Sequence, residues 1–133
     1  MTMKRGAITI RNTNSDNVQI YMELYEDGTV WMTKNEIASL FNVYYSSVEA
    51  NLKLLFKSNG LLEKTVRQEE HCIQTNDKKC IVEYLNLEVI IALSHRMDSY
   101  PCIHFRQWVA KQLALSCKKH FPIIVQLGTT TMN

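Results

Sequence analysis

The side chains best suited to chemistry lie along residues 44–57, and the chemistry they suit is recognition of a polyanion. Hydroxyls and ammonium groups recur there at helical spacing, and such groups donate hydrogen bonds to phosphates and base edges. The candidate DNA-binding residues of this segment are Tyr44, Tyr45, Ser46, Ser47, Ala50, Lys53 and Lys57. A second interpretation of the two tyrosines is that one of them packs on the preceding helix. Leu54 shares the face and suits either a thymine methyl or a protein partner.

Two further groups of cations extend this interpretation. Lys78 and Lys79 lie in a turn between two β-like runs, where they would place two positive charges beside a phosphate backbone. The alternative is an ordinary charged turn, because turns favour polar residues. Arg96 and Arg106 lie near His95 and His104 and are candidate phosphate contacts, since guanidinium forks fit phosphate. In the alternative, Asp98 pairs with one arginine and the other groups are solvated.

The four cysteines, at positions 72, 80, 102 and 117, include no C-x-x-C pair. Cys72 and Cys80 flank a predicted turn and would face each other across a hairpin if its loop has three residues. A metal site that uses them with His71 fails the spacing rules for four ligands. Reduced thiols are the expectation for a protein of the cytoplasm, and we expect neither a metal nor any other cofactor.

Two helices must position the first group of residues. Thr33 and Glu36 have the spacing of a capping box, which predicts a helix that begins there and runs to about Phe41. A second helix is predicted over about 46–58, because its apolar residues recur at i, i+4, i+7 and i+8. The Asn59-Gly60 pair would end it.

The break between the two helices has the pattern of a helix-turn-helix. Ala38 is small enough for a close crossing, Asn42 tolerates a left-handed backbone, and Val43 fills the junction. Val48 anchors the second helix five residues later. The next expected apolar anchor falls on Asn51, and Leu52 replaces it.

The remaining segments predict strands and two more helices. Strands are expected at 7–11, and at 18–25 and 30–32 around the turn Asp27-Gly28. A later hairpin is expected over 65–75 and 80–85, with its turn at 76–79. This hairpin follows the second helix, as the wing does in a winged helix.

Residues 86–120 predict two packing helices. Asn86 caps the first, over 87–97, and its nearly continuous apolar residues predict the most buried helix of the chain. Pro101 suits the first turn of the second, which ends near His120. The inner stripe of that helix is predicted to be Phe105, Trp108, Val109, Leu113 and Leu115. Residues 121–133 predict either a last strand or a tail.

Composition bounds the class of protein. The chain has 133 residues, of which 46% are hydrophobic and 21% charged, as expected of one soluble domain. No apolar run approaches the ~20 residues of a membrane span, and the start has no signal peptide, so we expect a cytoplasmic protein. Five Lys and Arg against three acids in 33–68, and five against one in 95–133, flank the acidic segment 69–94. This distribution suits a surface that binds a polyanion.

The sequence lacks the common catalytic motifs. It contains no P-loop, no G-x-G-x-x-G, no H-E-x-x-H and no G-x-S-x-G pattern. The histidines are scattered, and none has a carboxylate at a spacing that suggests a catalytic pair. We therefore expect a binding protein and no enzyme.

Two stretches resemble a known family. The stretches "VWMTKNEIASLFNV" and "YLNLEVIIALSHRMDSYPCIHFRQWVAKQL" resemble the N-terminal region of bacterial RhuM-type virulence-associated proteins. The likeness covers about Val30 to Leu113, and "FRQWV" is also similar to an element of phage antirepressor N-terminal domains. This resemblance implies a DNA-binding-like domain from mobile-element or pathogenicity-island proteins, and it carries over no catalytic residue. The closing "FPIIVQLGTTTMN" has no counterpart in it, and neither does the His-Pro-Phe motif of relatives with a Fic-type part.

These observations predict one α+β domain over residues 1–133. It would comprise a β-hairpin region over 1–32, a winged helix-turn-helix over 33–85, two packing helices over 86–120 and a tail. The predicted function is binding of double-stranded DNA by a transcriptional or virulence-associated regulator, as a homodimer. The alternative is a protein–protein interaction module that retains the helix-turn-helix core.

Overall fold

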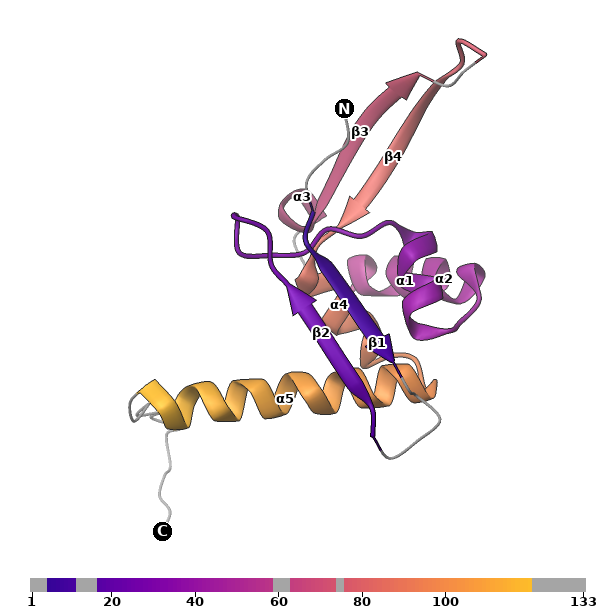
Figure 1. Cartoon of the computed structure of the whole chain (residues 1–133). Helices are drawn as coiled ribbons and strands as arrows, with labels where there is room; N and C mark the ends of the chain where they lie inside the picture. The colour runs from indigo at the N-terminus through magenta and orange to yellow at the C-terminus, as the bar shows by residue number, and fades with distance from the viewer. Residues whose placement is uncertain (1–4, 12–16, 59–62, 74–75, 121–133) are drawn as a thin grey trace.

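The computed structural model describes residues 5–11, 17–58, 63–73 and 76–120. Its helices and two antiparallel strand pairs form an α+β fold, which confirms the predicted class (Figure 1). The predicted stop at Asn59-Gly60 and the tail over 121–133 lie outside the described residues.

The first strand pair consists of β1 (Ala7–Arg11) and β2 (Gln19–Glu23). They are antiparallel, with Ala7 opposite Glu23 and Arg11 opposite Gln19. The predicted strand at 7–11 is therefore confirmed.

The predicted hairpin around Asp27-Gly28 is wrong. Gly28 does have the positive φ of a tight turn, 81°, and its N–H donates to the Tyr25 carbonyl at 2.9 Å. The chain then leaves β2. The backbone N–H of Trp31 donates to the Arg5 carbonyl, and Met32 forms an isolated antiparallel β-bridge with Leu85. Three residues form too short a strand to hold a partner alone, so distant segments determined their pairing.

Helices α1 (Lys34–Phe41) and α2 (Tyr45–Lys57) follow, with bounds close to those predicted. The capping box of α1 is complete, because the Thr33 hydroxyl accepts from the Glu36 N–H and the Glu36 carboxylate accepts from the Thr33 N–H. Local hydrogen bonds thus fix where α1 begins.

The second strand pair stands out from the helices. A single turn, α3 (Glu63–Val66), leads into β3 (Arg67–Ile73), which pairs with β4 (Lys79–Leu85). The predicted hairpin is confirmed, although α3 occupies the first two residues of the predicted strand. The outer half of this hairpin projects away from all the helices (Figure 1).

The last two helices are α4 (Leu87–Ser94) and α5 (Tyr100–His120). Asn86 caps α4 as predicted, by accepting from the Val89 N–H, but α4 ends at Ser94 and not at residue 97. The second half of α5 extends beyond the other described elements (Figure 1).

The predicted inner stripe of α5 is wrong in its second half. Phe105 is fully buried and Val109 packs against the core, whereas Leu113 and Leu115 are 65% and 52% exposed. Trp108 is half-buried and stacks on Phe105 with ring centroids 6.3 Å apart. Helical spacing alone could not reveal that α5 is longer than the described surface against which it packs.

One hydrophobic core joins the helices to the base of the hairpin. Phe41 of α1 meets Phe105 of α5 edge to face, with centroids 5.5 Å apart. Val48 of α2, Leu85 of β4 and Ile90 of α4 are fully buried in the same cluster. Across the part of the chain that the structure describes, none of the helices combines the length and the apolar character needed to cross a membrane.

Candidate nucleic-acid interface

The turn between α1 and α2 has the geometry that the sequence predicts. Asn42 has φ 55° and ψ 51°, in the left-handed region, and ends α1. Its N–H donates to the Ser39 carbonyl at 3.3 Å, and the Val43 N–H donates to the Ala38 carbonyl at 3.0 Å. The chain therefore reverses within two residues, and α2 packs back on α1.

Helix α2 has one buried face and one open face. Val48 and Leu52 are buried against the core, and Ala38 is buried on the facing side of α1. The predicted outward residues divide simply: Ser47 is half-buried, and the others are exposed, namely Ser46, Ala50, Lys53, Leu54 and Lys57. The exposed residues, together with Glu49, line a shallow hollow along the helix. Helix α2 thus presents an exposed row of hydroxyl, methyl and ammonium groups to a partner.

Both tyrosines at the start of α2 are accessible. Tyr44 is 84% exposed, and Tyr45 is exposed while its hydroxyl lies 3.5 Å from the Glu49 carboxylate. Neither ring is buried against α1. The Tyr44 ring is therefore accessible at the start of the helix, whereas the Tyr45 hydroxyl donates to Glu49 one turn further along α2.

The acid on the flank of α2 is neutralised by a neighbouring lysine. Lys34 Nζ lies 3.3 Å from the Glu49 carboxylate and 3.1 Å from that of Glu83. Burial opposes the charged form of Lys34, but hydrogen bonds and charge from Glu83 and then Glu49 outweigh it and raise its pKa. Lys34 therefore stays charged and offsets the negative charge of Glu49, which leaves Lys53 and Lys57 to dominate the open face.

The same lysine joins the hairpin to the helix pair. Glu83 of β4 forms an ion pair with Arg67 of β3 as well as with Lys34 at the start of α1. Tyr45 of α2 and Ile81 of β4 line one hollow with Lys34, so the start of α2 and the hairpin flank the same space. The hairpin is thus fixed beside α2 by charge pairs at its base.

The tip of the hairpin carries the two predicted cations. Lys78 and Lys79 are exposed. The Lys78 N–H donates to the Asn76 side chain at 3.3 Å, and Asp77 between them has a positive φ of 64°. Asp77, in the same turn, is an exposed acid that offsets part of the positive charge of the tip, and Glu69 is an exposed acid nearer the body.

The arginine corner separates into two different roles. Arg96 is exposed, and its Nε donates to the Asn51 side chain of α2 at 3.3 Å. The Asn51 amide in turn donates to the Ser47 carbonyl at 2.9 Å. Asn51, which interrupts the apolar pattern of α2, thus holds Arg96 at the edge of the open face. Sequence reasoning noted the interruption but missed this contact.

Arg106 points inward. One of its terminal nitrogens donates to the carbonyl of Ser94, the last residue of α4, at 2.7 Å and to that of Met97, beyond the helix, at 3.1 Å. The other lies 3.8 Å from the Asp98 carboxylate, which agrees with the alternative in which Asp98 pairs with one arginine. These carbonyls lack helical partners, so Arg106 acts as their cap, and its fork is already occupied.

The expectation of four reduced thiols is wrong in this structure. Cys72 and Cys80 form a disulfide, with Cα atoms 5.2 Å apart, while Cys102 and Cys117 are free. The strand register places Cys72 directly opposite Cys80, and sequence spacing alone could not fix that register. Within the described residues, no group of three His, Cys, Asp or Glu side chains is arranged to hold a metal ion.

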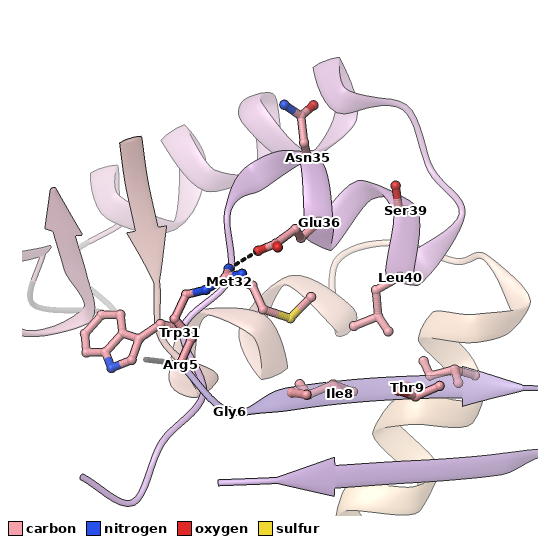
Figure 2. Close-up of a pocket in the computed structure, with 12 residues that line it drawn as sticks. Arg5, Gly6, Ile8, Thr9, Trp31, Met32, Asn35, Glu36, Ser39 and Leu40 are labelled. Carbon is pink, nitrogen blue, oxygen red and sulfur yellow. Dashed lines mark hydrogen bonds and ion pairs between the residues drawn. The ribbon is translucent and has the colours of Figure 1, made fainter. Parts of the chain in front are cut away.

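A third hollow lies between β1 and α1 (Figure 2). Arg5 and Glu36 form an ion pair at one end of it, and Arg5 also lies 5.2 Å from the centre of the Tyr84 ring. Burial raises the pKa of Glu36, but hydrogen bonds from Arg5 and Thr33 outweigh this and lower it. Its charged groups satisfy each other, so this hollow offers an incoming ion little.

Comparison with family models, with curated proteins and with solved structures finds no match to this chain. The function is therefore inferred from the geometry of the site and from the resemblance described above.

Proposed function

We propose that this protein binds double-stranded DNA through a winged helix-turn-helix, with α2 in the major groove and the β3–β4 hairpin as its wing. The observation that carries the proposal is the open face of α2. Exposed lysines and a serine lie along this face, and the nearest acid is paired with Lys34. An α-helix of this kind fits the major groove, where ammonium groups reach guanine edges or phosphates.

The arrangement of elements supports this assignment. The left-handed turn at Asn42 and the buried Ala38 and Val48 are the features that a helix-turn-helix requires. A hairpin follows the second helix, and the bridge between Met32 and Leu85 ties the segment before α1 to the base of that hairpin. The order of segment, two helices and hairpin is the order of a winged helix.

Five of the six candidate cations have a role in this proposal. Lys53 and Lys57 contact phosphates or base edges from α2, and Lys78 and Lys79 contact the backbone beside the groove. Arg96 extends the positive edge of α2. We leave Arg106 out of the interface because its donors are engaged at the end of α4.

The resemblance to RhuM-type proteins supports a biological setting. In this proposal, the protein is a cytoplasmic regulator of mobile-element or virulence-associated genes that acts by binding and without catalysis. A homodimer would present two copies of α2 to successive major grooves, as dimeric helix-turn-helix proteins do. The dimer stays a prediction.

The test compares the salt dependence of DNA binding between the parent chain and variants in which a single charge is reversed. Lys53→Glu is expected to weaken binding to a random duplex and to lower the salt slope by about 0.9 for each phosphate that the variant no longer binds. Lys111→Glu, an exposed lysine on α5, is the matched control and is expected to leave the slope unchanged. Electrophoretic shifts over a salt series measure both. No binding to random duplex DNA at low salt would disprove the proposal.

One observation favours a second function. Leu54 is 49% exposed in the middle of the α2 face, where it offers a protein partner an apolar contact. A protein-interaction module would use this leucine, so Leu54→Asp would abolish complex formation while Lys53→Glu would have no effect. The pair of variants therefore separates the two functions.

A further inference from the structure

The disulfide divides the hairpin into a paired stem and a tip. Cys72 and Cys80 are directly opposite each other, and beyond them the strands continue only through the pair Ile73 and Lys79 among the described residues. Lys78 and Lys79 therefore both lie in the segment that the disulfide closes. The bond fixes the distance across the base of this tip.

The position of the bond makes it accessible to reagents in solution. Both cysteines are half-buried, and none of the described helices covers the outer half of the hairpin (Figure 1). Ile73 and Ile81, on the neighbouring positions, are largely exposed and shield little. In a reducing compartment, disulfides are usually transient and catalytic or redox-sensing, in contrast to the stable bonds of secreted proteins.

The other two cysteines differ from this pair. Cys102 is fully buried, and burial raises the pKa of its thiol, so it is a poor nucleophile. Cys117 is half-buried on the last turns of α5, remote in sequence from both proposed contact surfaces. Among the described cysteines, a redox change at the DNA-binding surface therefore belongs to Cys72 and Cys80.

We propose that the Cys72–Cys80 disulfide is a redox switch that presents Lys78 and Lys79 to DNA in the oxidised protein and releases them in the reduced protein. This rests on the proposed function of the hairpin as a wing. In the reductive step, the thiolate of a dithiol attacks one cysteine sulfur, and the S–S bond breaks. The second thiol of the reductant then attacks the reductant's own sulfur in this mixed disulfide and releases the cysteine that was bound to it. The reductant leaves as a cyclic disulfide, and two electrons and two protons remain on the protein as two thiols.

The reason for the change in affinity is conformational entropy. In the oxidised protein the disulfide holds the ammonium groups of Lys78 and Lys79 near one position before DNA arrives. In the reduced protein these side chains must be ordered on binding. Reduction is expected to weaken binding by about threefold or more, the order expected for loosening one or two phosphate contacts.

The experiment compares the full chain with and without dithiothreitol, in a Cys117→Ser background that prevents cross-linking between chains. Under denaturing conditions, alkylation is expected to label only Cys102 in the oxidised protein, and to label Cys72 and Cys80 as well after reduction. Affinity for a random duplex should fall on reduction. A Cys72→Ser/Cys80→Ser variant should bind at the reduced level under both conditions.

A measurement without DNA separates this switch from the proposed function. Trypsin cuts after lysine, so cleavage after Lys78 or Lys79 should accelerate on reduction. Unchanged affinity in a protein that binds DNA would overturn the switch and leave the function intact, as would labelling of all three cysteines before reduction. Absence of binding in both states would overturn the function and the switch together, even if reduction accelerated cleavage.

Discussion

At the scale of single residues, the side chains that matter most are those that hold charge in a fixed place. Lys34 is shared between Glu49 and Glu83, so one ammonium group neutralises the flank of α2 and anchors the hairpin. Glu36 has a comparable position on α1, where it caps the helix and pairs with Arg5. Each of these residues joins a local structural role to a contact with a distant segment.

Glu36 gives a prediction about pH. Because the folded protein lowers its pKa, Glu36 stabilises the fold fully above the ordinary carboxyl value of 4.5, and this contribution disappears as pH falls through the lowered pKa. Glu36→Gln is therefore expected to lower the melting temperature by a few degrees at neutral pH and to have little effect at about pH 2.

Thermal unfolding at the two pH values measures this difference. Glu26→Gln, which changes an exposed carboxylate, is the matched control and should behave like the parent chain throughout. An effect of Glu36→Gln that is equally large in acid would mean that the charge of Glu36 is not its stabilising feature.

At the scale of elements, α4 and α5 meet at a corner that Arg106 holds together. Helix α4 ends three residues earlier than its apolar pattern suggests, and the carbonyl of its last residue, Ser94, accepts from the guanidinium group of Arg106. Ser99 strengthens the same region, because its hydroxyl donates to the Phe41 carbonyl at 2.6 Å and so ties the start of α5 to the end of α1. The corner therefore supports α1, against which α2 packs.

Replacing Arg106 tests this structural role. Arg106→Met keeps much of the side-chain volume but removes the donors to two carbonyls, and should lower the free energy of unfolding by about 1–3 kcal/mol. Arg96→Met, in an exposed arginine with one bond to Asn51, should change it by less than about 0.5 kcal/mol. Urea unfolding monitored by tryptophan fluorescence measures both. Equal effects would contradict the assignment of Arg106 as a cap.

At the scale of the whole molecule, contacts between distant segments place the hairpin beside the helix pair. Met32 bridges to Leu85, and the Leu87 N–H donates to the Thr29 hydroxyl at 3.0 Å. Glu83 adds the ion pairs to Lys34 and Arg67. A wing can assist α2 only if its base is rigid, so these contacts are requirements of the proposed function.

Two glutamates that face each other across the hairpin test this coupling. Glu83 has a side chain that is 15% exposed and paired with two cations, so Glu83→Gln should lower the free energy of unfolding by about 1–3 kcal/mol. Glu69 lies directly opposite, is exposed, and places a like charge beside Glu83. Glu69→Gln should therefore be neutral or stabilising by up to about 0.5 kcal/mol. Urea unfolding of both variants gives the comparison, and similar losses would show that Glu83 does not anchor the hairpin.

The sequence by itself determined the local features of this protein. The capping box at Thr33 and Glu36, the left-handed turn at Asn42 and the cap at Asn86 were all predicted and are confirmed. Each depends on a hydrogen bond or a backbone angle within about four residues, so neighbouring residue types suffice to specify it. The exposed row along α2 followed from the same short-range periodicity.

Only the tertiary structure decided which distant segments meet. It paired residues 30–32 with Arg5 and Leu85, turned Arg106 inward, and left Leu113 and Leu115 exposed. It also set the register that joins Cys72 to Cys80. These outcomes depend on the packing of elements separated by loops of varied length, and the free energies that select among alternative packings are sums over many contacts that no short stretch of sequence contains.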